Sequence, residues 1–60
     1  MNLSDKDRHL FLKCVEELNE LALELLHAVN KPSKDNWNKI CNEIQDVESW
    51  ILKIKNKEKC

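Results

Sequence analysis

Acidic side chains form two short groups whose spacing suits a shared metal-binding site. Glu17 and Glu20 are three residues apart, and so are Glu43 and Asp46. Residues three apart on an α-helix are neighbours on its surface. If a turn brings the two segments together, we expect the four carboxylates to meet as one acidic cluster.

The first segment contains nothing that would neutralise this charge. No basic residue lies between Glu16 and His27, and carboxylates at three- and four-residue spacing repel one another. A hard divalent cation would relieve the repulsion, because Mg²⁺ prefers carboxylate and water oxygens in octahedral geometry. Mg²⁺ held by the four carboxylates, with Mn²⁺ as a substitute, is therefore one interpretation of this spacing.

An alternative interpretation of the acids needs no metal. Acids that flank the apolar stripe of a helix usually face solvent. Lys39 then pairs with Glu43, and Lys13 pairs with Glu16 or Glu17, as exposed ion pairs that contribute little to stability.

The elements that would position these acids are two amphipathic helices joined by a short turn. Ser4 is a suitable N-cap, and apolar residues then recur at three- and four-residue steps. Pro32 interrupts this pattern, and Ser33 is a suitable N-cap for the next helix. We therefore predict an all-α antiparallel hairpin in one domain over 1–60, with helices over about 4–30 and 34–56 and a turn at 31–33.

The apolar stripes predict which faces of the helices pack together. The stripe of the first helix is centred on Leu18 and Leu25, and we expect Cys14, Trp37 and Cys41 to be buried with it. The apolar residues that lie off both stripes are Leu12, Leu23, Leu26 and Leu52. Because a hairpin leaves this second apolar edge uncovered, we expect self-association into a four-helix bundle, as a homodimer or homotetramer.

Length and composition limit the classes of protein to consider. The chain has 60 residues and a net charge of −1, which gives no overall attraction to nucleic acid or membrane surfaces. We find no signal peptide and no apolar run that could span a bilayer. The odd number of cysteines favours reduced thiols and a cytoplasmic location, with a Cys14–Cys41 bridge as an alternative.

The order and spacing of the acidic residues resemble those of a known enzyme family. Residues 16–20 read EELNE, an EExxE motif, and residues 43–46 read EIQD, an ExxD motif, with 22 residues between Glu20 and Glu43. This arrangement is similar to that of the MazG-like all-α nucleoside triphosphate pyrophosphohydrolases, relatives of the dimeric dUTPases and of phosphoribosyl-ATP pyrophosphatase. The similar region runs from Lys13 to Lys55.

The resemblance implies an activity and a role for each acidic residue. Members of the family hydrolyse the α–β phosphate bond of a nucleoside triphosphate and release a monophosphate and pyrophosphate. By match of motif, Mg²⁺ would be held by Glu17, Glu20, Glu43 and Asp46. Orientation or deprotonation of the attacking water would fall to Glu16, Glu17 or Glu20.

Substrate contacts are expected near the second acidic pair. Trp50 lies four residues after Asp46, and its indole could stack on the nucleobase. Full members of the family carry phosphate-binding residues on helices that follow the ExxD helix. In their place, the candidates to bind the phosphates are Lys53 and Lys55, with Lys39, Lys31 or Lys34 as alternatives.

Two other functions fit the same pattern. The chain could be a non-catalytic helical module that binds a nucleotide or docks its apolar face on a partner protein. It could also be a coiled-coil assembly element, since the second helix has heptad-like spacing from Ile40 onward. Mg²⁺-dependent release of pyrophosphate would distinguish the enzyme from both.

Overall fold

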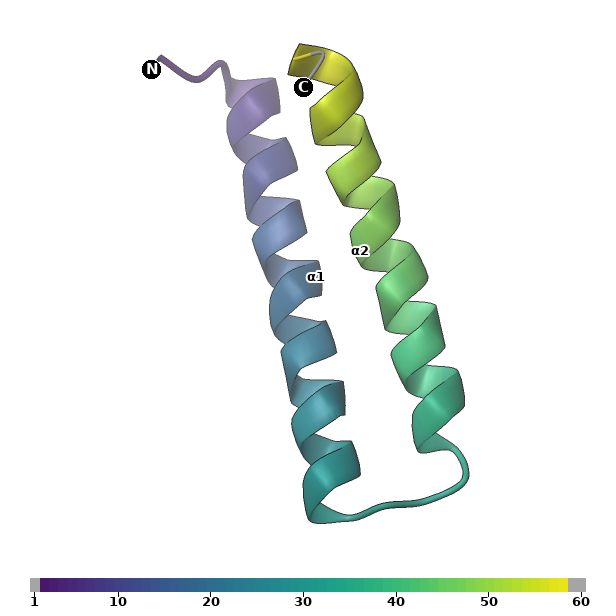
Figure 1. The fold of residues 1–60 in the computed structure, drawn as a ribbon. Helices are drawn as coiled ribbons and strands as arrows, with labels where there is room; N and C mark the ends of the chain where they lie inside the picture. The colour runs from purple at the N-terminus through teal and green to yellow at the C-terminus, as the bar shows by residue number, and fades with distance from the viewer. Residues whose placement is uncertain (1, 59–60) are drawn as a thin grey trace.

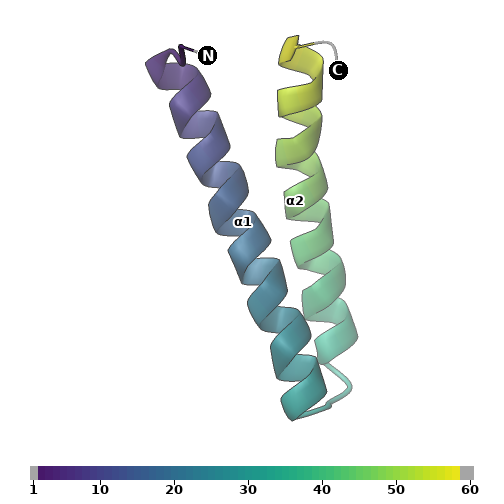
Figure 2. The same ribbon diagram turned by 60° about the vertical axis from the view of Figure 1, so that its left-hand side comes forward.

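The computed structural model describes residues 2–58, which form two α-helices, α1 (Asp5–Asn30) and α2 (Asn36–Glu58), and a short connection. The helices lie side by side and run in opposite directions, so the start of α1 and the end of α2 lie at the same end (Figures 1 and 2). The predicted all-α antiparallel hairpin is therefore confirmed. Met1, Lys59 and Cys60 lie outside the described residues.

The ends of α1 follow from the residues beside them. Ser4 caps the helix as predicted, because its hydroxyl oxygen accepts a hydrogen bond from the Asp7 amide at 3.1 Å. The helix ends before Lys31, whose backbone has φ −145° and ψ 76°. Pro32 explains this end, since a proline disfavours helical geometry in the residue that precedes it.

The second helix begins two residues later than predicted, and Ser33 does not cap it. The Ser33 carbonyl accepts a hydrogen bond from the Asn36 amide at 3.3 Å, which closes a turn before the helix starts. The first helical bond then runs from the Lys39 amide to the Asp35 carbonyl at 3.1 Å. The Ser33 hydroxyl donates to Asn36 Oδ1 at 3.2 Å, so Ser33 stabilises the turn instead of the helix end.

The helices pack along a row of buried and half-buried residues, which we call the seam. In α1 the seam consists of Leu10, Cys14, Glu17, Leu21, Glu24 and Ala28, and in α2 of Asn36, Ile40, Glu43, Val47, Trp50 and Ile54. Both rows alternate steps of three and four residues, the spacing of helices that pack side by side. Among the described residues, the buried apolar core is limited to Cys14, Ile40 and Val47.

Cys14 is buried as predicted, but the core predicted around it was wrong for Leu18, Leu25, Trp37 and Cys41. Leu18 and Leu25 are 45% and 47% exposed, and Trp37 is 74% exposed. Cys41 is also exposed, and it and Cys14 are both free thiols. The seam follows one edge of each apolar stripe, so it takes in Cys14, Ile40 and Val47 together with glutamates that flank the stripes. Leu18 and Ile44 each follow a seam glutamate, and one residue further along a helix is turned by about 100°, away from the seam.

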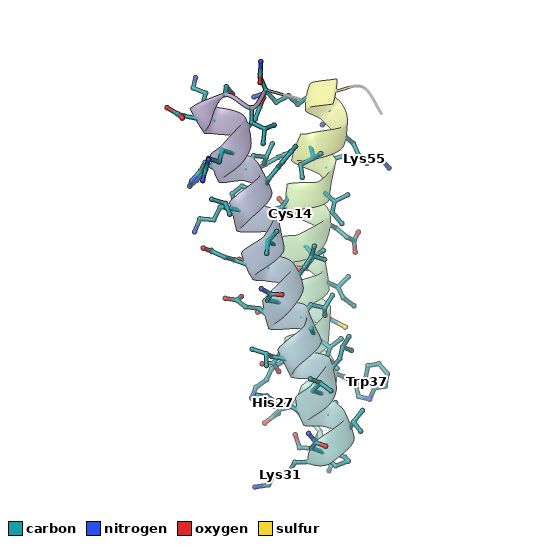
Figure 3. The ribbon with its side chains drawn as sticks, turned by 90° about the vertical axis from the view of Figure 1, so that its left-hand side faces the viewer. Cys14, His27, Lys31, Trp37 and Lys55 are labelled. Carbon is teal, nitrogen blue, oxygen red and sulfur yellow. The ribbon has the colours of Figure 1, made fainter. Side chains whose placement is uncertain are left out.

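The hairpin consequently has two different sides along the seam. One side, the acidic side, carries Glu17, Glu20, Glu24, Glu43 and Asp46. The other, the apolar face, carries Val15, Leu18, Leu25, Trp37, Ile44 and Ile51. Leu25 and Trp37 line one groove between the helices, whereas Glu24 and Lys39 line another. Figure 3 shows His27 and Trp37 pointing to opposite sides of the hairpin.

Candidate functional site

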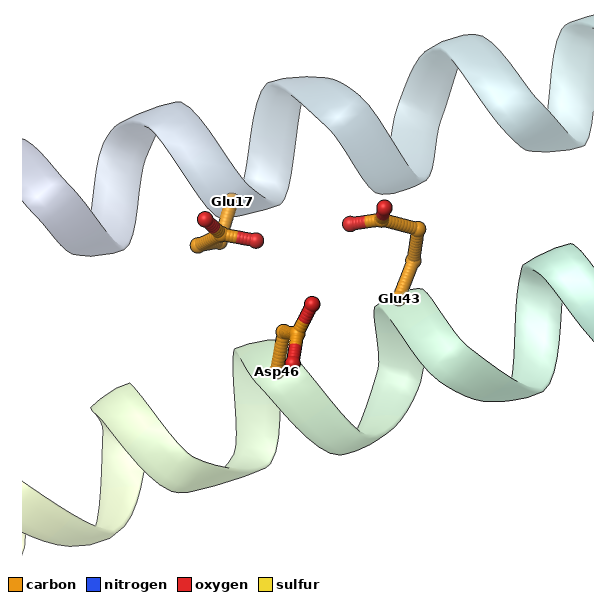
Figure 4. A group of neighbouring side chains, drawn as sticks. All are labelled: Glu17, Glu43 and Asp46. Carbon is orange, nitrogen blue, oxygen red and sulfur yellow. The ribbon is translucent and has the colours of Figure 1, made fainter.

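Three of the four predicted metal ligands come together across the seam. Glu17 of α1 and Glu43 and Asp46 of α2 each offer a carboxylate oxygen, and these oxygens lie within 4.8 Å of one another. Figure 4 shows the three side chains reaching into the space between the two helices. We call them the carboxylate cluster. Oxygens on opposite sides of one Mg²⁺, each at about 2.0–2.1 Å from it, lie about 4.2 Å apart, so carboxylate oxygens separated by as much as 4.8 Å would have to move closer together to share Mg²⁺.

Two carboxylates of the cluster are partly withdrawn from water without a partner. Oxygen Oε2 of Glu17 and Oε2 of Glu43 are both buried and accept no hydrogen bond from the described residues, although each side chain as a whole is half-buried. The two ion pairs found between residues 2 and 58 lie elsewhere. A buried carboxylate oxygen without a hydrogen bond is unfavourable, so the cluster favours an added positive charge.

Crowding raises the pKa of two carboxyl groups in the cluster. Burial raises the pKa of Glu17, and the charges of Glu20 and Asp46 raise it further. Burial likewise raises the pKa of Glu43, with additional contributions from the charges of Glu20 and Glu17. Each of these causes penalises the charged form of the carboxyl group. A cation among the carboxylates would act in the opposite direction and lower both pKa values.

The other two predicted acidic residues are placed differently. Glu20 is exposed and lies outside the group of oxygens within 4.8 Å, yet its charge is close enough to raise the pKa of Glu17 and Glu43. Glu16 is exposed, and its Oε2 lies 3.3 Å from Lys13 Nζ, as expected for an ordinary exposed ion pair. Glu20 is thus at the edge of the cluster, and Glu16 is engaged elsewhere.

The predicted substrate-binding residues lie on either side of the cluster along α2. Trp50 is half-buried in the seam, and the Lys53 ammonium lies 4.0 Å from the centroid of its ring. This cation–π contact occupies a face of the indole. A nucleobase could stack there only after Lys53 moves away. Lys39 is exposed and lines a hollow beside the connection, and none of the ion pairs among the described residues joins it to Glu43.

Glu24 is a residue that the sequence analysis did not place in the site. It is half-buried in the seam and lines the hollow, of about 470 Å³, that also contains His27 and Lys39. The sequence places it on the same flank of α1 as Glu17, since it lies seven residues further along the helix, but the EExxE and ExxD motifs do not include it.

Comparisons with known proteins do not assign a family. No family model, no curated protein and no solved structure matches the chain. Neither helix, over the residues that the structure describes, is both long and apolar enough to cross a membrane. The function is therefore inferred from the geometry of the site and from the acidic motifs.

Proposed function

We propose that the chain is a Mg²⁺-dependent nucleoside triphosphate pyrophosphohydrolase of the MazG-like type. The observation that carries the proposal is the convergence of Glu17, Glu43 and Asp46 from two helices, with carboxylate oxygens within 4.8 Å of one another. These residues belong to the EExxE and ExxD motifs, in the order that the resemblance requires. Acids that serve only solubility gain nothing from meeting across a helix interface.

The residues present fit a hard divalent cation. Glu17 and Glu43 each have a buried oxygen without a hydrogen-bond partner among the described residues, and carboxylate oxygens are the ligands that Mg²⁺ prefers. We assign the binding of Mg²⁺ or Mn²⁺ to Glu17, Glu43 and Asp46, whereas Glu20, predicted from the motif as a fourth ligand, lies at the edge of the cluster. Bound Mg²⁺ supplies positive charge that screens the triphosphate and stabilises the leaving pyrophosphate.

Hydrolysis requires a group that orients water and accepts its proton. The water oxygen bonds to the α-phosphorus, the bond from that phosphorus to the bridging oxygen breaks, and pyrophosphate leaves. Glu20 is the best placed of the three candidate residues, because it is exposed at the edge of the cluster and can pass the proton to solvent. Glu17 is taken up by the cluster, and Glu16 is paired with Lys13.

Substrate binding is assigned to the cationic and aromatic residues of α2. Lys53 leaves the ring of Trp50 when the nucleotide binds, so that its ammonium contacts phosphate and the indole face becomes free for the base. Lys39 contributes positive charge from the hollow beside the connection. A cytoplasmic location is part of this proposal, since the free thiols of Cys14 and Cys41 suit a reducing compartment.

The proposal is tested by pyrophosphate release from a panel of nucleoside triphosphates with Mg²⁺. We expect release by the wild type, loss of release when EDTA replaces Mg²⁺, and release no faster than a protein-free blank for Glu43→Gln and Asp46→Asn. Glu48→Gln is the matched control, because Glu48 is an exposed acid of α2 outside the cluster. Equal release by all variants, or none by the wild type from any substrate, would remove the proposal.

A second candidate is a helical oligomerisation or binding module without turnover. The exposed apolar face favours it, since large apolar patches mark docking surfaces. Calorimetry separates the two candidates. Nucleotide or protein binding that is unaffected by EDTA and yields no pyrophosphate supports the module.

A further inference from the structure

The polar side chains of the acidic side form one row along each helix. On α1 the row advances by three and four residues and consists of Glu17, Glu20, Glu24, His27 and, just past the helix end, Lys31. On α2 the row consists of Lys39, Glu43, Asp46, Trp50 and Lys53. Because the helices are antiparallel, the end of the first row lies beside the start of the second (Figure 1). The carboxylate cluster thus stands between a cationic end at the connection and an aromatic end at Trp50.

The hollow beside the connection adjoins the carboxylate cluster. Lys39 lies four residues before Glu43, which is about 6 Å along the axis of α2. The volume of the hollow, about 470 Å³, is within the range of about 300–1,000 Å³ that is usual for small-molecule sites. Its walls combine hydrogen-bond donors and cations with one acid, and they include Glu24, His27, Asn30, Lys31, Asn36 and Lys39.

The two lysines of the hollow are not committed to acids. The ion pairs found between residues 2 and 58 join Lys13 to Glu16 and Lys57 to Asp7. Lys31 and Lys39 take part in neither pair. Two ammonium groups beside one carboxylate leave an excess of positive charge in the hollow, and this excess favours an anionic ligand.

The wall formed by the connection is held in place by Asn36. The Asn36 amide donates a hydrogen bond to the Ser33 carbonyl at 3.3 Å, and its Oδ1 accepts one from the Ser33 hydroxyl at 3.2 Å. Its Nδ2 donates to the Lys31 carbonyl at 3.3 Å. These bonds tie the connection to the first turn of α2, so Lys31 and Lys39 border the same hollow before any ligand binds. A preformed site loses less conformational entropy on binding.

We infer that this hollow binds the β- and γ-phosphates of the substrate, so that the nucleotide lies along the acidic side with its base toward Trp50. The identity of the ligand rests on the proposed function. The hollow offers two lysines and no aromatic ring, which suits the most highly charged part of the substrate. The other end offers one ring and Lys53, which suits a base and the α-phosphate. In this orientation the carboxylate cluster faces the bond that is broken.

The orientation makes Lys31 and Lys39 the residues that select a triphosphate. Lys39 and Trp50 are 11 residues apart, or about 16 Å along α2, a span comparable to that of an extended nucleoside triphosphate. A monophosphate bound at Trp50 does not reach the hollow, and a diphosphate fills it only in part. We therefore expect the hollow to bind pyrophosphate on its own.

Inorganic pyrophosphate is a direct probe of the hollow, because the proposed reaction does not cleave it. By calorimetry in Mg²⁺, we expect Lys31→Gln and Lys39→Gln each to weaken pyrophosphate binding roughly tenfold, since each removes a charge-assisted hydrogen bond. Lys34→Gln is the matched control, because Lys34 is an exposed lysine of the same connection that does not line the hollow. Lys34→Gln and Lys53→Gln should both bind pyrophosphate as wild type does.

Amide NMR signals locate the same probe without any substitution. Addition of pyrophosphate and Mg²⁺ to wild type, compared with Mg²⁺ alone, should shift the signals of residues 30–39. The signals of residues 50–53 should stay where they are. This measurement decides the question even if a lysine variant does not fold.

The outcomes separate the hollow from the hydrolase activity. The inference is overturned if wild type does not bind pyrophosphate, if Lys39→Gln and Lys34→Gln bind it equally, or if the shifted signals surround Trp50. Each of these results would stand even where wild type releases pyrophosphate from a triphosphate. Conversely, binding that depends on Lys31 and Lys39 in a chain that hydrolyses no nucleotide would support the hollow as the anion site and remove the hydrolase alone.

Discussion

The acidic side and the apolar face are built from the same two helices, yet each is unfavourable in the isolated hairpin for a different reason. On the acidic side, burial and neighbouring charges raise the pKa of Glu17 and Glu43, so the carboxylates lack positive charge. On the apolar face, large side chains such as Leu18 and Ile44 are exposed, so they lack a cover. A bound cation can neutralise the acidic side within one hairpin, whereas the apolar face can be covered only by a second protein surface.

Because the hairpin buries so little, we expect its stability to depend strongly on any ligand that binds the folded chain. A chain of this size buries only about 60% of the surface that it exposes when unfolded. Here the apolar core among the described residues is Cys14, Ile40 and Val47, and the seam also holds three glutamates. Any ligand that binds the folded chain alone adds to its stability by mass action. We therefore expect metal and chain concentration to act separately on the folded state.

The largest effect is expected for Ile40→Ala in the seam. Ile40 is 7% exposed, and truncation of a buried isoleucine to alanine costs about 2–5 kcal/mol because it leaves a cavity. Ile51→Ala is the control on the apolar face, where the side chain is 40% exposed. Urea unfolding followed by circular dichroism should show a lower free energy of unfolding for Ile40→Ala than for wild type at every chain concentration. For Ile51→Ala this difference from wild type should become smaller as the protein is diluted. If both variants respond to dilution in the same way, the distinction between the seam and the apolar face is wrong.

The second effect is stabilisation by Mg²⁺. At a concentration 100-fold above its dissociation constant, a cation that binds only the folded chain adds about 2.7 kcal/mol. We expect Mg²⁺ to raise the thermal midpoint of wild type and of Ile51→Ala alike, since the apolar face contributes no ligand. Sodium chloride at matched ionic strength is the control for screening. An equal rise with sodium would show that no specific cation site exists.

The fold was predictable from the sequence because its signals are local. Pro32 and the regular recurrence of apolar residues predicted two helices and their connection, and the motif spacing predicted that Glu17 would meet Glu43 and Asp46. The position of the seam was not predictable in the same way. A wide apolar stripe centred on Leu18 shows which face avoids water, but not which edge of it meets the other helix of the same chain.

A smaller effect is expected when the buried charges of the cluster are removed. In EDTA, the double variant Glu17→Gln with Glu43→Gln should unfold at a higher temperature than wild type, because a neutral amide of the same shape replaces a crowded carboxylate. The same variant should lose its response to Mg²⁺. Glu48→Gln should retain the wild-type behaviour in both solutions. A double variant that is less stable than wild type in EDTA would show that the carboxylates are satisfied without metal.

The pH dependence of the metal-free hairpin follows from the same pKa shifts. The folded-state pKa of Glu17 and Glu43 lies above the ordinary value of about 4.3, so between these values the folded chain binds more protons than the unfolded chain. Stability in EDTA should therefore rise as the pH falls from neutrality through this window.

Asp7 acts in the opposite sense at lower pH. Its hydrogen bond with Lys57 holds the pKa of Asp7 below its ordinary value, so its contribution is lost as the pH falls through that lower range. Thermal unfolding across the acidic range should thus pass through a maximum. The increase in stability on the neutral side of this maximum should be absent from the double variant Glu17→Gln with Glu43→Gln. If the double variant keeps this increase, groups other than Glu17 and Glu43 cause it.

The smallest effect is expected for the ion pair between Lys13 and Glu16, which lies outside the cluster. The side chains are 41% and 61% exposed, and such pairs contribute about 0.2–1 kcal/mol. Lys13→Ala should therefore change the urea midpoint only slightly, and addition of salt should reduce the difference from wild type, because salt screens exposed charges. It should also leave the midpoint shift caused by Mg²⁺ unchanged, since Glu16 is not a member of the cluster. A large change in the midpoint shift caused by Mg²⁺ would indicate that Glu16 belongs to the site, in the catalytic role that the motif resemblance implies.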